Sequence, residues 1–312
     1  MRLRNFVLVL VFVLPLLAAS AYADTPGIGT AAPFAVLGEA GVTNTGPSTI
    51  YGSVAGSSGT PSVTGFTFST SPGPGMVIAP GVGITTGVAN SGPGTPFGDA
   101  TAAYIAAQAA PGAIFEGLST LGAGGLPSLN PGVYNFSSAT SLNGVLMLNA
   151  QGSSSASWVF QIGSALTVNG GSTVEIVNAG ALGAFTGSIT WAVGSAATFS
   201  GAPSTFLGTI ISNGATPDTL TNGDTIACGR VISLNSQVTL INDTIAIPNC
   251  TVTTTTSGGG TGTGVVIPPG GSVPPPIPSP EPGTFGLLSS GLLAMVLLAF
   301  RKSRVSSPSL SC

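Results

Sequence analysis

The sequence has almost no charge. Only 5% of its 312 residues are Asp, Glu, Lys or Arg, against about 25% in an ordinary globular domain. Lys and Arg lie at the two ends of the chain apart from Arg230, and no Lys precedes residue 302. Because binding to phosphate requires clustered Lys and Arg, nucleic acid and anionic membrane surfaces are excluded as partners of the central part.

Histidine is absent, and the acidic residues are scattered along the chain. An enzyme acting on polysaccharide would need a general base or two carboxylates that face each other in a groove. Zinc would need His or further thiols near the few cysteines. We therefore expect no catalytic residue, metal or cofactor. The eight carboxylates of residues 24–250 are Asp24, Glu39, Asp99, Glu116, Glu175, Asp218, Asp224 and Asp243.

Arg230 is the single basic residue of the central part. A catalytic role is one interpretation. A structural ion pair with Asp224 or Asp243 is the interpretation that we prefer, because Gly229 and Arg230 fall at the junction of a turn and a strand.

Cysteine is also scarce, with three residues in the chain. Cys312 lies at the far end, whereas Cys228 and Cys250 fall in the part expected to fold. An oxidising compartment would allow these two to pair. The bridge would close a loop of about 22 residues and stabilise the fold by about 3 kcal/mol on the chain-entropy estimate. A metal site is the weaker alternative.

The N-terminus has the three parts of a secretory signal peptide over residues 1–23. Arg2 and Arg4 carry the positive charge, residues 6–17 are apolar, and residues 21–23 read Ala-Tyr-Ala, a cleavage site before Asp24. The alternative is a membrane anchor, but the apolar run is shorter than the about 20 residues that span a bilayer.

The C-terminus has a spacer followed by a three-part tail. Residues 251–279 are rich in Thr, Gly and Pro, a composition that predicts a disordered linker. Residues 280–304 then hold Pro280, Glu281 and Pro282, an apolar segment over 283–300 and a basic cluster, and residues 305–312 end the chain.

This tail resembles the PEP-CTERM sorting signal of Gram-negative bacteria. The resemblance implies processing by a protease of the exosortase type, transient anchoring in the inner membrane, and delivery to the cell surface or the medium. The alternative is a permanent transmembrane anchor held by the basic cluster.

Four short apolar runs between turn residues predict strands in the central part. They cover residues 158–162, 188–193, 207–211 and 230–232. Equivalent positions in them are 31, 18 and 21 residues apart, at Ile162, Val193, Ile211 and Ile232. Periods of about 20 residues are typical of solenoids, and the longer first gap leaves room for a further strand over residues 173–177. The sequence predicts one β-solenoid domain over residues 24–250, with a β-sandwich as the alternative.

A second strand after each run carries a threonine between two positions that could be buried. Alternation along a strand points these threonines away from the core, so stacked copies would form a column on one outer face. A rigid, uncharged column of this kind suits binding to an ordered surface. The alternative is structural, because threonine favours strands and stabilises sheets. The predicted face consists of Thr167, Thr198, Thr219 and Thr239, flanked by Asn169, Ser200 and Thr221.

One segment, residues 99–110, predicts a helix. Asp99 is expected to cap its first turn, and Pro111 and Gly112 to end it. The predicted contact with the sheet is a stripe of small and apolar side chains at helical spacing. This stripe consists of Ala102, Ile105, Ala106 and Ala109.

Together these motifs resemble the microbial ice-binding-protein-like domain. The residues that carry the resemblance are 34–37, 42–46, 103–104, 129–134, 158–164, 205–210, 229–230 and 238–245. The resemblance implies a mainly β fold, an irregular right-handed β-solenoid with one long helix packed alongside. It further implies an exported ice-binding (antifreeze) protein whose threonine face adsorbs to ice or ordered water.

Two features qualify that expectation. Pro217, Asp218 and Asp224 are expected to disturb a flat ice-facing sheet at the third repeat. The flat polar face and the sorting tail also suit a cell-surface or biofilm-matrix protein that binds extracellular polysaccharide, and this is the alternative function.

Overall fold

The computed structural model describes residues 27–57, 63–68, 76–78, 84–88, 92–115, 117, 119–123, 125–180, 183–247, 251–257 and 260–266. These ranges all fall in one compact unit, residues 1–274. The predicted signal peptide, Cys250 and the predicted sorting tail lie outside the described residues. Within the described ranges, no helix has the length and apolar character needed to cross a membrane.

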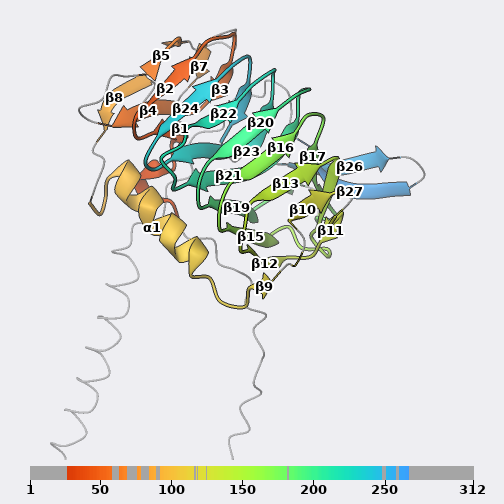
Figure 1. Ribbon diagram of the computed structural model, residues 1–312. Helices are drawn as coiled ribbons and strands as arrows, with labels where there is room; N and C mark the ends of the chain where they lie inside the picture. The colour runs from red at the N-terminus through yellow and green to blue at the C-terminus, as the bar shows by residue number, and fades with distance from the viewer. Residues whose placement is uncertain are drawn as a thin grey trace, which may run out of the picture. The chain divides into compact units, whose positions relative to one another are not determined.

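Short parallel strands stack into successive coils around one core, which confirms the predicted mainly β solenoid (Figure 1). Each coil contributes to three rows of paired strands. One row is the eight-stranded sheet, in the spatial order β10 (Thr120–Gly122), β13 (Thr140–Asn143), β16 (Leu166–Asn169), β20 (Ala197–Ser200), β22 (Asp218–Leu220), β24 (Gln237–Leu240), β2 (Gly41–Asn44) and β5 (Val63–Thr64).

The second row is the helix-side face. Its spatial order is β9 (Ile114–Phe115), β12 (Gly132–Phe136), β15 (Ser157–Ile162), β19 (Ser188–Val193), β21 (Thr205–Ser212), β23 (Thr225–Ser233), β1 (Phe34–Gly38), β4 (Ser53–Ser57) and β8 (Ile84–Val88).

The remaining row is the third face. It runs through β11 (Ser128–Leu129), β14 (Val145–Asn149), β17 (Thr173–Val177), the first residues of β21 and β23, β25 (Thr244–Ala246), β3 (Thr49–Tyr51), β7 (Met76–Ile78) and β6 (Thr67–Phe68). The strand predicted over residues 173–177 is β17.

The strands β21 and β23 each belong to two faces because the chain bends within them. The bends lie at Gly208, with φ 105°, and at Cys228, with φ 53°, and the pairing register shifts between Leu207 and Thr209. Parallel, coil-by-coil pairing of this kind excludes the β-sandwich alternative, whose sheets are antiparallel.

The coils do not follow the order of the sequence. Strands β1 to β8 form one end of the stack, and α1 (Pro96–Gln108) then runs along its side to β9 at the other end (Figure 1). From there the coils return until β23 pairs with β1, so that β1 lies between β23 and β4. The N-terminal coil thereby stacks directly on the coil of β23, although the two are nearly 200 residues apart in the chain. Val36, for example, pairs with Val231.

The predicted helix is present, but its cap and its buried side were predicted wrongly. Thr95 caps the first turn by accepting from the Gly98 amide at 3.1 Å. All four residues of the predicted stripe are exposed, Ile105 at 59%. Alanine occurs on every side of this helix, so hydrophobicity alone does not define the face that packs. The buried residues are Phe97, Ala100, Ala103 and Ala107.

Polar side chains fix the orientation of α1 on the solenoid. Gln161 donates to the carbonyls of Ala107, at 2.9 Å, and Ala110, at 3.1 Å, and Gln108 donates to Ala192 O at 3.0 Å. The small 3-10 helix η1 (Gly29–Ala31) is tied to α1 by Asp99, which accepts from the amide and hydroxyl of Thr30.

The predicted disordered linker contains a β-hairpin. Strands β26 (Thr251–Ser257) and β27 (Gly260–Val266) pair with each other in antiparallel fashion, and also with β18 (Gly183–Ala184) and β17. For these residues the linker prediction was wrong. Threonine and valine favour strands, and in this segment their preference outweighs the flexibility of the glycines.

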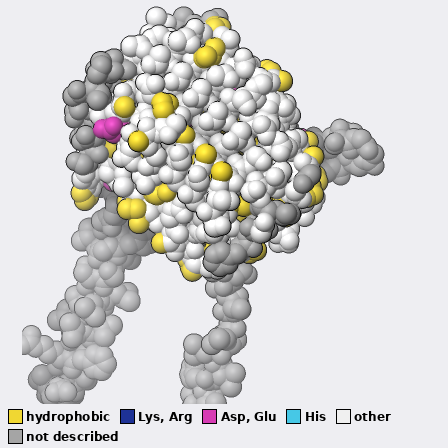
Figure 2. Space-filling view, viewed as in Figure 1, with side chains coloured by type: hydrophobic (Ala, Val, Ile, Leu, Met, Phe, Trp, Pro, Cys, Tyr) yellow, Lys and Arg dark blue, Asp and Glu magenta, His cyan; other side chains and the backbone are white. Residues whose placement is uncertain are grey.

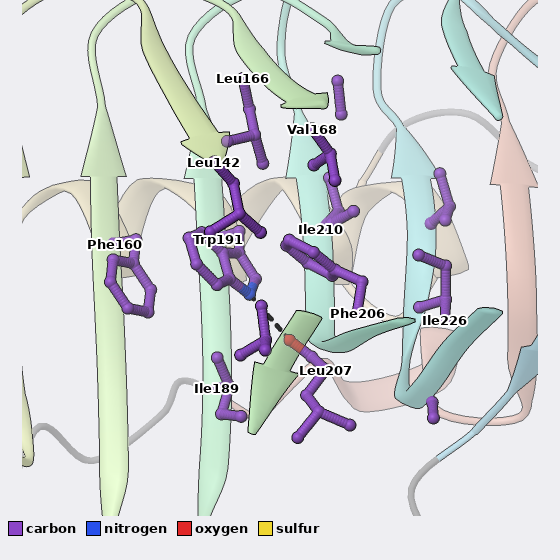
Figure 3. Packing of buried hydrophobic residues seen from close by; sticks show 14 of the residues in the cluster. Leu142, Phe160, Leu166, Val168, Ile189, Trp191, Phe206, Leu207, Ile210 and Ile226 are labelled. Atoms are coloured by element: carbon purple, nitrogen blue, oxygen red, sulfur yellow. Dashed lines mark hydrogen bonds between the residues drawn. The ribbon is translucent and has the colours of Figure 1, made fainter. Parts of the chain in front are cut away.

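Stacked aromatic rings form the centre of the core (Figure 3). Phe160 and Trp191 lie parallel, with ring centroids 3.8 Å apart and planes at 7°. Phe206 follows at 4.8 Å from Trp191. The indole of Trp191 donates to the Leu207 carbonyl at 3.0 Å, so its one polar atom is satisfied inside the core.

Replacing Trp191 with alanine should therefore destabilise the solenoid strongly. We expect a loss of about 3–5 kcal/mol in the free energy of unfolding, because the cavity and the lost stacking cannot be filled by neighbours from rigid strands. The control Ile105→Ala removes an exposed side chain of α1 and should change it by less than about 0.5 kcal/mol. Chemical denaturation measures both, and similar values for the two variants would contradict this picture of the core.

Candidate functional site

A ladder of seven threonines and one serine crosses the eight-stranded sheet. Each member pairs in register with the next one in the neighbouring strand, without a break. In spatial order this threonine ladder is Thr120, Ser141, Thr167, Thr198, Thr219, Thr239, Thr43 and Thr64. The four threonines predicted from the sequence thus stand in one row, including Thr219.

Alternation along the strands points the ladder outward. In β16, for example, Leu166 and Val168 are fully buried, while Thr167 between them is partly exposed. No member of the ladder is buried, and Thr198 and Thr64 are exposed. Figure 3 shows Leu142, Leu166 and Val168 pointing into the core beneath this sheet. The aliphatic layer therefore supports the ladder from below.

The predicted flanking residues form a second, less regular row. Asn169 pairs with Ser200 and donates to the side-chain oxygen of Asn143 in the preceding strand. Thr221 lies just after β22, and its hydroxyl donates to the Phe199 carbonyl at 3.1 Å. The flanking row is polar and partly ordered by its own hydrogen bonds.

Half of the ladder was not predicted from the sequence. Thr120, Ser141, Thr43 and Thr64 belong to it, and Thr43 sits between a buried Val42 and a buried Asn44, the same alternation that identified the others. The missing signal was spatial, since nothing local in the sequence places the N-terminal coil beside the coil of Thr239.

Spacing and charge make this face a regular, neutral surface. Neighbouring strands in a sheet lie about 4.8 Å apart, and alternate residues of one strand about 6.6 Å apart. The ladder contains no charged residue. Figure 2 shows no Lys or Arg on its coloured surface, and it shows Asp or Glu atoms at the left edge of that surface. β-branched side chains have few rotamers, so the hydroxyl and methyl groups are held at nearly fixed points.

The third face carries a shorter threonine row. Thr173, Thr205, Thr225, Thr244 and Thr49 pair in register. This third-face ladder has no flanking row, because the residues two positions after Thr205 and Thr225 are buried where the strands bend. An exposed Glu175 follows Thr173 at the same spacing. The eight-stranded sheet is therefore the broader and more uniform surface.

A model of the ice-binding-like family matches residues 36–246, more than half of the chain. The chain belongs to the ice-binding-like family. Across 275 residues it is 34% identical to an ice-binding protein of Nostoc sp. (strain HG1), covering 88% of this chain and 86% of the relative.

Solved structures agree with this assignment of the ice-binding-like domain. The crystal structure of an ice-binding protein from the Antarctic ascomycete Antarctomyces psychrotrophicus is 28% identical, with a TM-score of 0.54 over 71% of this chain and 98% of that chain. An ice-binding protein from an Arctic yeast is 26% identical, with a TM-score of 0.56 over 72% of this chain and 93% of that one. Both are similar in fold and match nearly their whole length.

Three carboxyl groups of the ice-binding-like domain are buried instead of facing the solvent. Asp218 and Asp243 are fully buried and Asp224 nearly so, which corrects the expectation that Asp218 and Asp224 disturb the outer face. Asp224 accepts from the Ser204 amide at 2.8 Å, and Asp243 from the Ile241 amide at 2.7 Å. These aspartates join neighbouring coils and leave the threonine ladder uncharged.

Arg230 forms no ion pair with Asp224 or Asp243, so that prediction was wrong. Its guanidinium donates to the Ala32 carbonyl at 2.7 Å and to the Thr209 hydroxyl at 3.4 Å. Burial lowers its pKa to about 10. Asp224 and Asp243 instead accept hydrogen bonds from main-chain amides. Arg230 holds the segment before β1 against β23.

Cys228 is disulfide-bonded, and Cys250 lies outside the described residues, so the pairing of these two stays a prediction. Across the described ranges, no group of three or more His, Cys, Asp or Glu side chains could hold a metal ion.

The buried aspartates should make the protein more stable in mild acid. Burial raises the pKa of Asp218 and of Asp243 to about 7, above the 3.8 of an exposed group. Between about pH 4 and about pH 7 the folded state therefore binds more protons than the unfolded state. The free energy of unfolding falls as the pH rises through this range, by up to about 1.4 kcal/mol per pH unit for each group.

We expect a higher melting temperature at pH 5 than at pH 8. Asp99, whose hydrogen bonds from Thr30 and Gly94 lower its pKa, titrates below this window. Asp218→Asn keeps a carbonyl oxygen for its amide partner and removes the titration of this one group, so it should make the profile less steep, with the contribution of Asp243 remaining. A melting temperature that rises from pH 5 to pH 8 would contradict the raised pKa values.

Proposed function

We propose that this protein adsorbs to ice through the threonine ladder and thereby inhibits ice growth or recrystallisation. The observation that carries the proposal is the unbroken register of eight outward hydroxyl-bearing residues in eight parallel strands. The family and the names of the relatives support ice as the ligand.

The mechanism follows from the rigidity of the ladder. A surface held by paired strands loses little conformational entropy when it meets a lattice. Each threonine offers a methyl group that is poorly hydrated and a hydroxyl that can bond to ordered water. A charged side chain would keep its own hydration shell, and the ladder contains no charged side chain. The action is adsorption, without covalent chemistry.

The proposed binding surface extends the predicted one. Thr167, Thr198, Thr219 and Thr239 form its centre, and Asn169, Ser200 and Thr221 flank them. Thr120, Ser141, Thr43 and Thr64 complete the row at its two ends.

Charged substitutions within the ladder should abolish ice adsorption. We expect Thr198→Lys combined with Thr239→Lys to lower partitioning of the purified protein into growing ice by more than about tenfold, because the contacts of a multivalent surface act together. Both sites are partly or fully exposed, so the free energy of unfolding should change by only about 0.5 kcal/mol per site.

The matched control is Thr225→Lys combined with Thr244→Lys. These residues belong to the third-face ladder and are the same residue type in the same kind of strand. Full adsorption by this control beside loss in the first variant supports the proposal. Adsorption that survives in both variants refutes the proposal. Loss of adsorption in the control alone would show that the third face binds ice instead. Binding of wild-type protein to extracellular polysaccharide but not to ice would favour the adhesive alternative.

We further propose that the protein is exported by a Gram-negative bacterium and processed at both ends. The signal-peptide pattern of residues 1–23 and the three-part tail of residues 280–304 support this, with Pro280, Glu281 and Pro282 as the motif read by an exosortase-type protease. The protein would be held briefly in the inner membrane and end at the cell surface or in the medium.

Mass spectrometry of the protein from its native host tests this proposal. The mature chain is expected to begin at Asp24 and to lack the apolar segment of residues 283–300. A chain recovered from the membrane fraction with that segment intact would instead indicate a permanent anchor.

A further inference from the structure

The weakest step in the threonine ladder lies between β20 and β22. Only Thr198 and Thr219 pair in register there, whereas β16 and β20 share four pairs and β22 and β24 share three. Pro217 comes directly before β22, and proline has no amide hydrogen to offer to a neighbouring strand. These two rungs therefore need another connection to stay aligned.

The side chain of Asp218 provides that connection. In β16 the amide of Leu166, the residue before the ladder position, donates to the main-chain carbonyl of Ala196 at 3.0 Å. At the equivalent place in β20, the amide of Ala197 donates to Oδ1 of Asp218 at 2.6 Å. A carboxyl oxygen thus replaces the carbonyl that regular strand pairing uses.

The other carboxyl oxygen is held by a serine hydroxyl. The hydroxyl of Ser212, at the end of β21, donates to Oδ2 of Asp218, and the same hydroxyl lies 3.4 Å from that of Ser233, at the end of β23. All three residues are fully buried. Hydrogen bonds are stronger in such a low-dielectric interior, so one side chain fixes β22 to β20 through Ala197 and to the end of β21 through Ser212.

The orientation of Asp218 also determines that of Thr219. Successive side chains of a strand point to opposite faces, and a slip of one residue would turn Thr219 inward. With Asp218 anchored inside, Thr219 stands outside, beside Thr198. Hydrogen bonding of a carboxyl group therefore determines what the outer surface presents.

We propose that Asp218 is a positioning residue of the ice-binding surface. Its carboxyl group holds Thr219 in register with Thr198 and so joins the two halves of the threonine ladder, four rungs on each side. The inference rests on the proposed function of that ladder. Without the anchor, the halves present two shorter surfaces that no longer share one lattice.

Two substitutions at this position test the inference. Asp218→Ala removes the anchor, whereas Asp218→Asn keeps an acceptor for Ala197 and a polar partner for Ser212. The control Asp243→Ala removes an equally buried carboxyl group that binds the amides of Ile241 and Asp224 and lies outside the β20–β22 step. Thermal hysteresis near 0 °C, where each variant is first shown to be folded, is compared with hydrogen exchange at the Ala197 amide.

For Asp218→Ala we expect about tenfold lower hysteresis at equal protein concentration and about tenfold faster exchange at Ala197. Asp218→Asn should stay within about twofold of wild type in both measurements. Asp243→Ala should melt earlier yet keep its hysteresis, which a merely structural role of Asp218 would not explain.

Unchanged hysteresis in a folded Asp218→Ala, or an equal loss in Asp243→Ala, overturns the inference. If Asp218→Ala does not fold, Ser212→Ala is measured instead, because it removes the hydrogen bond from Ser212 to Asp218 and leaves the carboxyl group in place. Lowered hysteresis in Ser212→Ala supports the inference, and wild-type hysteresis refutes it. If wild-type protein shows no hysteresis, the proposed function fails. Exchange at Ala197 then still reports whether Asp218 aligns the two rungs.

Discussion

The register between successive coils is the constraint on which the rest of the structure depends. Parallel strands repeat one alternation of inward and outward residues, so a residue's place in one coil determines its neighbours in the next. Val36 paired with Val231 and Thr43 paired with Thr239 extend this register across the junction of the two ends of the domain. The aromatic stack inside and the threonine ladder outside are both consequences of it.

Charge is placed so as not to interfere with that outer surface. Asp218, Asp224 and Asp243 turn inward and accept hydrogen bonds from amides of adjacent coils, and Arg230 is buried beneath the segment before β1. Burying these groups costs desolvation, which the raised pKa values of the aspartates express. In return the exposed sheet stays neutral, as a surface that orders water requires.

Local pattern was sufficient to predict the centre of the site. The repeated threonine between two positions that could be buried predicted Thr167, Thr198, Thr219 and Thr239, and the spacing of the apolar runs predicted the solenoid. Pairing between distant segments was not visible, so Thr43 and Thr64 were missed. The side of α1 that packs against the solenoid was predicted wrongly, because alanine occurs all around that helix. The inward turn of Asp218 could not be foreseen, because its partner Ala197 comes from another coil.

The central claim is that the neutral, in-register face meets an ice lattice. The most direct measurement grows a single-crystal ice hemisphere in a dilute solution of the fluorescently labelled wild-type protein. We expect fluorescence incorporated on defined crystal planes, since one flat ladder fits only certain lattice spacings. A hemisphere that excludes the labelled protein would show that this face does not bind ice.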